Sequence, residues 1–315
     1  MLYSVRHITG FRYQPAVRES MMEVRLRPRN EGRQRCLSFQ LNIEPSANVM
    51  SYRDFLGNTV HHFDIAGSQT EIKVAAQGLV EVQATDGEEL DGGSWEELDR
   101  RVASEDHWEM LLPSQYACFT EPLKALAREL ECERRGTPHE FLVELNRAIY
   151  ESFKYVPNST KVDSPIDEAI EARQGVCQDF SHIMISLARM LRIPCRYVSG
   201  YLYHEPKDKD RSMDSASHAW VEAFLPNAGW TAFDPTNNLV GGNRHIRVAL
   251  GRDYADVPPT RGVYKGDAQS ELMVAVSVTA ADMVTEELGP ALVVRSRPVI
   301  ARPAPRRDQE QQQQQ

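Results

Sequence analysis

The sequence has few cysteines and no long apolar run. Its five cysteines are an odd number and include no Cys-x-x-Cys pair, which excludes a simple disulfide framework and a zinc knuckle and suits a reducing compartment. No apolar stretch approaches the roughly 18 residues that cross a membrane. Residues 1–7 lack the apolar core of a secretion signal. We therefore expect a cytoplasmic protein with no membrane partner.

An excess of positive charge is also missing. The 315 residues carry a net charge of −9, which argues against nucleic acid as the main partner. The charged loop after residue 206 contains Asp208, Asp210 and Asp214, but it lacks the central glycine and the closing glutamate of a calcium loop. We therefore expect neither a metal nor another cofactor.

The N-terminal part alternates apolar and polar residues in the way that strands do. This alternation covers five stretches: 2–8, 22–27, 37–43, 60–65 and 71–74. Turn-forming residues separate them, and short strands at this spacing predict an antiparallel β-sandwich domain over residues 1–85. The acidic segment that follows, 86–119, is interpreted as a linker with irregular or short helical structure.

From residue 120 the pattern becomes helical. Thr137, Pro138 and Glu140 have the spacing of a capping box, and an amphipathic stripe then runs to Phe153. A later helix is expected from residue 177, because its apolar residues recur on one face until proline stops them at 194.

Beyond this helix the period changes from helical to two. The alternation predicts strands over 195–203, 218–225, 230–234 and 271–280. A helical block followed by a strand block predicts an α+β core over residues 120–290. The Pro-, Arg- and Gln-rich residues 291–315 cannot bury a core, so we expect them to form a disordered tail.

Cys177 is a candidate nucleophile because it lies at the first turn of the predicted long helix. The unpaired N–H groups and the positive end of the helix dipole favour a thiolate there. Position by itself is weak evidence, since many cysteines at helix starts only pack against their neighbours. A catalytic reading therefore requires a base and a group that orients it.

The predicted hairpin supplies both groups. In one register Asp234 lies opposite Trp220 and diagonal to His218 on the same face, with diagonal backbones roughly 7–8 Å apart. A slip of one residue would move Asp234 to the other face. The rival histidines are worse placed: His182 lies about 140° around the helix from Cys177. His204 and His245 are expected in or beside loops, with no obvious orienting carboxylate.

Three blocks of sequence together resemble the transglutaminase-like superfamily. They are Gly-Val-Cys-Gln-Asp-Phe-Ser-His at 175–182, Ser-His-Ala-Trp-Val-Glu at 217–222 and Gly-Trp-Thr-Ala-Phe-Asp-Pro-Thr at 229–236. The N-terminal part is similar to a β domain that precedes the core in a bacterial branch of this family. Stretches 3–7, 26–29, 54–58 and 251–259 carry that likeness, which extends to about residue 280.

The resemblance implies a papain-like core with Cys177 as nucleophile, His218 as base and Asp234 as orienter. It also implies acyl transfer from an amide or peptide carbonyl of a protein or peptide substrate through an acyl-thioester. An amine acceptor would make the protein a transglutaminase, and water would make it a cysteine protease or amidase. Both readings use the same residues and stay open here, and the oligomeric state is not predicted.

An oxyanion formed in this reaction would be held by the Cys177 N–H and a second donor. Gln174, Tyr155 and Trp220 are the candidates for that donor or for the substrate pocket. Two other classes also stay open. One is a non-catalytic binding module with the same fold, and the other is a zinc site built on Cys177 and His218, which lacks ligands at the usual spacing.

Overall fold

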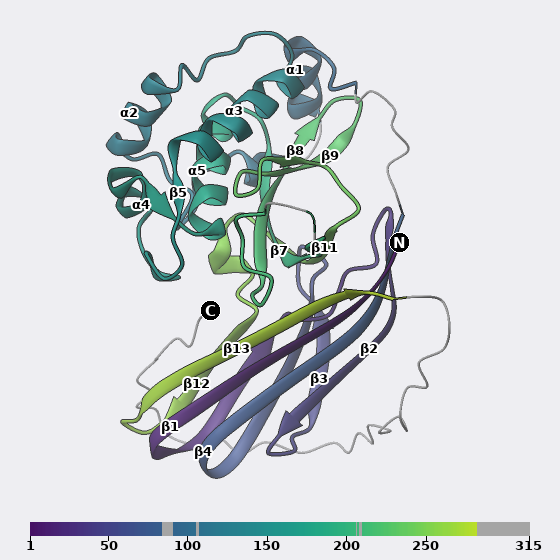
Figure 1. Ribbon diagram of the computed structural model, residues 1–315, viewed down its shortest axis with the longest axis vertical. Helices are drawn as coiled ribbons and strands as arrows, with labels where there is room; N and C mark the ends of the chain where they lie inside the picture. Colours follow the sequence, from purple (N-terminus) through teal and green to yellow (C-terminus); the bar gives the residue numbers. More distant parts are fainter. Residues whose placement is uncertain (84–90, 105–106, 206, 208–209, 282–315) are drawn as a thin grey trace.

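A computed structural model describes residues 1–83, 91–104, 107–205, 207 and 210–281. Figure 1 shows helices gathered against one sheet in the upper half and long strands in the lower half. The fold is therefore α+β, as predicted. No helix of the described residues is both long enough and apolar enough to cross a membrane.

Three of the first four strands are longer than expected, and the third was not predicted. The four are β1 (Leu2–Val24), β2 (Gln34–Glu44), β3 (Val49–Arg53) and β4 (Thr59–Val82). β1 pairs antiparallel with β4 along nearly its whole length, with register shifts between Arg12 and Val17 and between Arg18 and Ser20. Each shift interrupts the alternation of side chains while backbone pairing continues, so one strand resembles two in the sequence.

The two halves of these long strands form the two layers of a sandwich. Phe11 pairs with Ile72 in one half, and Met22 pairs with Phe63 in the other. All four side chains are buried in the same apolar cluster. β2 extends one half and β3 the other, because they pair with opposite ends of β4. The predicted sandwich is thus built by bent strands that continue from one layer into the other.

The sandwich is completed by the end of the described chain. β12 (Thr260–Lys265) pairs with residues 18–24 of β1, and β13 (Gln269–Ala280) pairs with residues 3–14. The predicted core boundary at residue 290 is therefore wrong, since these strands belong to the N-terminal sheet. Alternation reveals a strand, but it does not reveal which strand it pairs with. The predicted tail, 291–315, lies outside the described residues.

The upper half contains five α-helices among the described residues. They are α1 (Trp95–Ser104), α2 (Glu121–Glu129), α3 (Pro138–Ser152), α4 (Ile166–Ala172) and α5 (Cys177–Met190). The capping box before α3 is confirmed. The Glu140 carboxylate accepts from Thr137 N–H at 2.8 Å, and the Thr137 hydroxyl accepts from Glu140 N–H at 3.2 Å.

A five-stranded antiparallel sheet lies beside these helices, in the order β10-β9-β8-β7-β11. Its strands are β7 (Cys195–Leu202), β8 (His218–Leu225), β9 (Gly229–Asp234), β10 (Leu239–Val240) and β11 (His245–Gly251). Short elements complete the fold: β5 (Lys154–Tyr155), β6 (Gln174–Gly175), η1 (Trp108–Met110) and η2 (Tyr254–Asp256). α5 is buried along almost its whole length between the sheet and the other helices.

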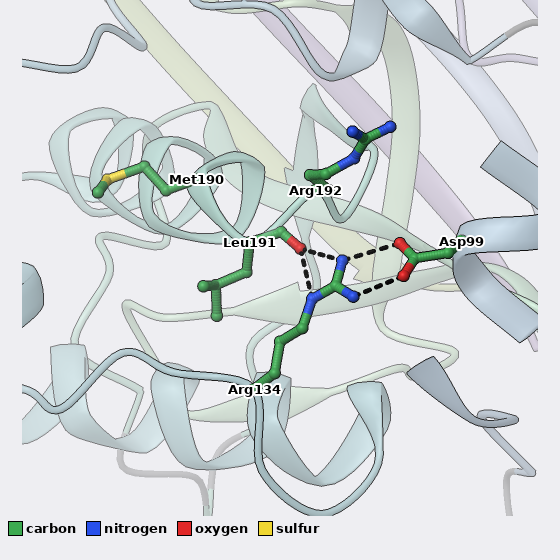
Figure 2. Close-up of a pocket in the computed structure, with 5 residues that line it drawn as sticks. All are labelled: Asp99, Arg134, Met190, Leu191 and Arg192. Atoms are coloured by element: carbon green, nitrogen blue, oxygen red, sulfur yellow. Dashed lines mark hydrogen bonds and ion pairs between the residues drawn. The ribbon is translucent and has the colours of Figure 1, made fainter. Parts of the chain in front are cut away.

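The segment interpreted as a linker contributes to this core. α1 lies within residues 86–119, and its Trp95 and Leu98 side chains are buried in the helical cluster. Figure 2 shows how Arg134 joins α1 to the end of α5: its guanidinium contacts Asp99 at 2.7 and 2.9 Å and donates to the Leu191 carbonyl at 2.9 Å. The short helical structure expected in this segment is present as α1, but the interpretation of this part as a linker is wrong, because the apolar face of α1 is buried in the core.

Two side chains of the sandwich complete the free edge of β11. Gln34 donates to the Arg247 carbonyl at 2.8 Å and accepts from Arg247 N–H at 2.7 Å. Asn58 contacts the Leu250 carbonyl and N–H in the same way, at 2.8 Å each. These amides take the place of a further strand at an edge that would otherwise be unpaired. The N-terminal domain thereby fixes the position of β11.

Candidate active site

Cys177 is held at the first turn of α5 by a buried acid. The Asp179 carboxylate accepts from Val176 N–H at 2.8 Å and from the Thr160 hydroxyl at 2.6 Å. A Cβ on Gly175 would lie 2.8 Å from Asp179 Oδ2, so glycine is required for the carboxylate to approach the backbone. Burial raises the pKa of Asp179 in spite of these hydrogen bonds. These hydrogen bonds thus fix the backbone at the start of α5, which carries the Cys177 side chain.

His218 and Asp234 meet across β8 and β9. Val221 pairs with Phe233, and continuing this register places Asp234 opposite Trp220, as expected from the sequence. His218 Nε2 lies 2.8 Å from Asp234 Oδ2, and both side chains are 1% exposed. The predicted contact is therefore present in the structure.

The other nitrogen of His218 is turned away from Asp234. Nδ1 is buried and, among the described residues, has no hydrogen-bond partner. Cys177 is close enough to this imidazole to raise its pKa. The ring thus lies between a carboxylate and a thiol, which is the arrangement that a base needs to activate a nucleophile.

His218 and Asp234 each stabilise the charged form of the other. Burial lowers the pKa of His218, but Asp234 and then Cys177 outweigh it and raise the value from 6.5 to about 10. Burial raises the pKa of Asp234, yet His218 and His245 together hold it well below its usual range. At neutral pH an imidazolium beside a carboxylate is therefore the favoured state.

This ion pair predicts how stability depends on pH. Because the pKa of His218 is raised on folding, its contribution is complete below 6.5 and is lost as the pH rises through about 10. We expect wild type to lose more unfolding free energy than His218→Gln between these pH values. Denaturant titrations at several pH values measure the difference, and equal losses in both proteins would contradict the ion pair.

A second histidine, His245, also contacts Asp234. Asp234 Oδ2 accepts from His245 Nε2 at 3.1 Å and from Asn237 Nδ2 at 2.9 Å. His245 lies beside a loop, as expected, because it is the first residue of β11, but the expectation that it has no orienting carboxylate is wrong. His204 lies in the segment after β7, as expected, but it also has a carboxylate nearby, since its Nδ1 is 3.0 Å from Asp210 Oδ2. The alternating sequence of β11 could have revealed the strand, but not its neighbours.

His182 is excluded as the base by its surroundings. It lies on α5 with its side chain buried, and its Nε2 accepts a hydrogen bond from Tyr254 N–H at 3.2 Å. Burial lowers its pKa to about 4, so it is neutral at physiological pH. Tyr116 stacks on its ring at a centroid distance of 5.6 Å. His182 is therefore a packed core histidine.

The three pocket candidates lie in different environments. Tyr155 is half-buried, and its pKa is raised to about 12 by burial and by the nearby Cys177, although Met213 N–H bonds its oxygen. Gln174 pairs with Lys154 through β6 and lies three residues before Cys177. Trp220 is fully buried and stacks on His218 at 6.0 Å, which argues against a direct contact with an oxyanion.

Among the residues that the structure describes, His218, Asp234 and His245 form a group that could hold a metal ion. One ligand atom from each lies within 4.8 Å of the others. However, both imidazole Nε2 atoms are within hydrogen-bond distance of the same carboxylate oxygen. Hydrogen bonding therefore accounts for their proximity.

Comparison with known families gives this geometry a context. Residues 3–81 match the bacterial transglutaminase-like N-terminal region, and residues 124–235 match the transglutaminase-like superfamily. The chain belongs to the transglutaminase-like superfamily. The second match contains Cys177, His218 and Asp234, and the first covers most of the sandwich of this transglutaminase-like protein.

Relatives and solved structures agree with this membership. An uncharacterised protein of Mycobacterium leprae is 32% identical over 277 residues, covering 87% of this chain and 97% of that protein. A protein-glutamine gamma-glutamyltransferase of Pseudomonas aeruginosa is 32% identical over 154 residues, 45% of this chain and 23% of that protein. The structure of a proposed cysteine protease from Cytophaga hutchinsonii, 22% identical, has a TM-score of 0.71 and covers 90% of this chain and 92% of its own. The last comparison shows the fold of this transglutaminase-like chain.

Proposed function

We propose that this protein catalyses cysteine-dependent acyl transfer from amide or peptide carbonyls of protein or peptide substrates. The observation that carries the proposal is the placement of His218. Its Nε2 is bonded to a buried carboxylate, while the rest of the ring remains available to Cys177 at the start of α5. Membership of the transglutaminase-like superfamily supports the same chemistry.

The reaction follows from these positions. The Cys177 thiolate attacks the substrate carbonyl, and a tetrahedral oxyanion forms. As the C–N bond breaks, the His218 imidazolium gives its proton to the departing amine, leaving an acyl-thioester and neutral imidazole. An amine or water then attacks the thioester while His218 accepts its proton. Breaking the C–S bond regenerates the thiolate and the imidazolium.

Two donors are assigned to the oxyanion. The Cys177 backbone N–H lies in the first turn of α5, where N–H groups lack partners within the helix. Tyr155 is the second, because it lies near Cys177 and its raised pKa keeps the phenol protonated. A phenol O–H beside the reacting carbonyl can donate to the oxygen that becomes negative.

The acceptor distinguishes a transferase from a hydrolase. The name of the Pseudomonas relative favours an amine acceptor, and water would make the same site a protease or amidase. A glutamine peptide incubated with and without a fluorescent primary amine separates these reactions. Amine incorporation identifies the transferase, whereas release of ammonia or a cleaved peptide without incorporation identifies the hydrolase.

The thiolate–imidazolium pair predicts unusual alkylation of Cys177. Iodoacetamide should modify Cys177 rapidly at pH 6, well below the ordinary thiol pKa of about 8.5. Burial raises the pKa of Cys36, Cys118, Cys132 and Cys195, so these thiols should react slowly at the same pH. Mass spectrometry of the adducts over time measures each rate.

His218→Ala tests whether the pair causes this reactivity. The variant should lose the fast reaction at pH 6 and regain it only near the ordinary thiol pKa. His62→Ala, on sandwich strand β4, is the matched control and should react like wild type. An unchanged pH dependence in His218→Ala would remove the basis of the proposed function and favour a binding module.

A further inference from the structure

Two imidazoles share one oxygen of Asp234. His218 Nε2 and His245 Nε2 lie 2.8 and 3.1 Å from Asp234 Oδ2, and Asn237 Nδ2 lies 2.9 Å away. The other oxygen accepts from the backbone N–H groups of Thr236 and Asn237, at 3.0 and 3.2 Å. The carboxylate is 1% exposed, so these five donors replace its water. Each donor therefore restricts how the carboxylate can rotate.

The shared oxygen sets where the ring protons lie. Since Asp234 Oδ2 accepts, Nε2 of each imidazole carries a hydrogen. In a neutral ring Nδ1 is then an acceptor, and for His218 this nitrogen is the one available to Cys177. His245 Nδ1 is buried, and no described residue bonds it. Cys177 acts on the pKa of His218, so we assign the proton that moves in the reaction to His218.

The ring of His245 is itself held firmly. It meets Trp220 edge-on at a centroid distance of 4.9 Å, and Trp220 in turn stacks on His218. β11, which carries His245, is anchored by Gln34 and Asn58 of the sandwich. The N-terminal domain thus contributes to the position of Asp234.

We propose that His245 is a positioning residue for the reaction: it holds Asp234 Oδ2 in place, so that His218 keeps its Nε2–H on the carboxylate and its Nδ1 toward Cys177. This inference rests on the proposed function. The titratable and charged groups around the three side chains are Cys177 on α5, His204 beyond β7, Glu222 on β8 and Arg247 on β11. Glu222 and Arg247 contact each other at 3.4 Å.

The experiment compares three variants with wild type. His245→Leu removes the donor and keeps an apolar side chain, whereas His245→Gln keeps an N–H near the position of Nε2. His61→Leu is the matched control, because His61 is also a buried histidine with an unpartnered Nδ1, but it lies in the sandwich. Iodoacetamide rates at Cys177 are measured at pH 6 and pH 9.5, together with the melting temperature.

The expected result depends on pH. His245→Leu should react about 10- to 100-fold more slowly at pH 6, because a small displacement of the base costs that much. At pH 9.5 it should react like wild type, since this pH lies above the ordinary thiol pKa of about 8.5. His245→Gln should retain most of the rate at pH 6, and His61→Leu all of it. A rate loss of equal size at both pH values, or none, would overturn the inference.

A second measurement does not depend on the reaction. In ¹⁵N-labelled protein the His218 Nε2–H signal should exchange slowly with water in wild type and His245→Gln, and faster in His245→Leu. Slow exchange of this signal in His245→Leu would overturn the positioning role of His245, whatever the alkylation experiment shows. The absence of a reactive thiol in the alkylation experiment would instead contradict the proposed function. Stoichiometric metal in the purified protein, lost in His245→Leu, would also overturn the positioning role and make His245 a ligand.

Discussion

Replacing Cys177 by alanine should abolish incorporation of a fluorescent amine into a glutamine peptide, and hydrolysis of the same peptide. Removing a covalent nucleophile typically lowers kcat by about 10⁴-fold or more. The fold should persist, because Cys177 is only partly buried and the helix start is held by Asp179 and Thr160. Initial rates and the melting temperature of the same preparations measure the two effects separately.

Cys132→Ala is the matched control for this experiment. Cys132 is also partly buried in the helical half, and its thiol pKa is raised to about 11 by burial. It should leave both rates unchanged. Cys177→Ala that retains more than a trace of activity, with an unaltered melting temperature, would mean that the thiol is not the nucleophile. The acyl-thioester mechanism would then have to be abandoned.

Asp234→Asn should have the second-largest effect. Oδ2 accepts from three donors, and an amide NH₂ in its place would face two imidazole N–H groups and the Asn237 amide. Relief requires His218 to adopt the other tautomer, with the proton on the nitrogen that should accept from Cys177. The wrong tautomer in such a triad costs about 10⁴-fold in kcat. Removing one partner of a buried pair also destabilises a protein by about 3–5 kcal/mol.

The two effects of Asp234→Asn can be separated. Asp253→Asn is the matched control, because Asp253 is buried as well and accepts from Tyr116 N–H at 2.7 Å, but it does not contact His218. Both variants should be less stable, whereas the rate per folded molecule should fall only in Asp234→Asn. If that rate stayed within tenfold of wild type, Asp234 would not orient the base.

Local signals in the sequence were sufficient for much of the site. The capping box at Thr137 and the start of α5 at Cys177 depend on residues a few positions apart. The meeting of His218 and Asp234 depends on a hairpin with a short turn at 226–229, and the turn sets the register. Side chains that are joined by such short connections have few alternative pairings.

Other elements could not be predicted, because their partners are distant in the chain. β13 alternates clearly, yet it pairs with β1, more than 250 residues earlier, instead of extending the core sheet. The acidic sequence of α1 conceals that Trp95 and Leu98 enter the helical core. The hydrophobic effect is non-directional and depends only on the apolar area removed from water. The apolar pattern of one segment therefore does not identify the segment against which it packs.

The sequence by itself determined the α+β class, the caps and the predicted trio of Cys177, His218 and Asp234, since these follow from short-range periodicity, turn chemistry and family motifs. Only the tertiary structure decided that His245 joins them. β11 pairs with β7, on the far side of β8 from Asp234, and two amides of the N-terminal sandwich fix its edge. A buried carboxylate needs hydrogen-bond donors, and any residue that the fold brings within reach can supply them. Because such a donor can come from any part of the chain, no sequence spacing predicts it.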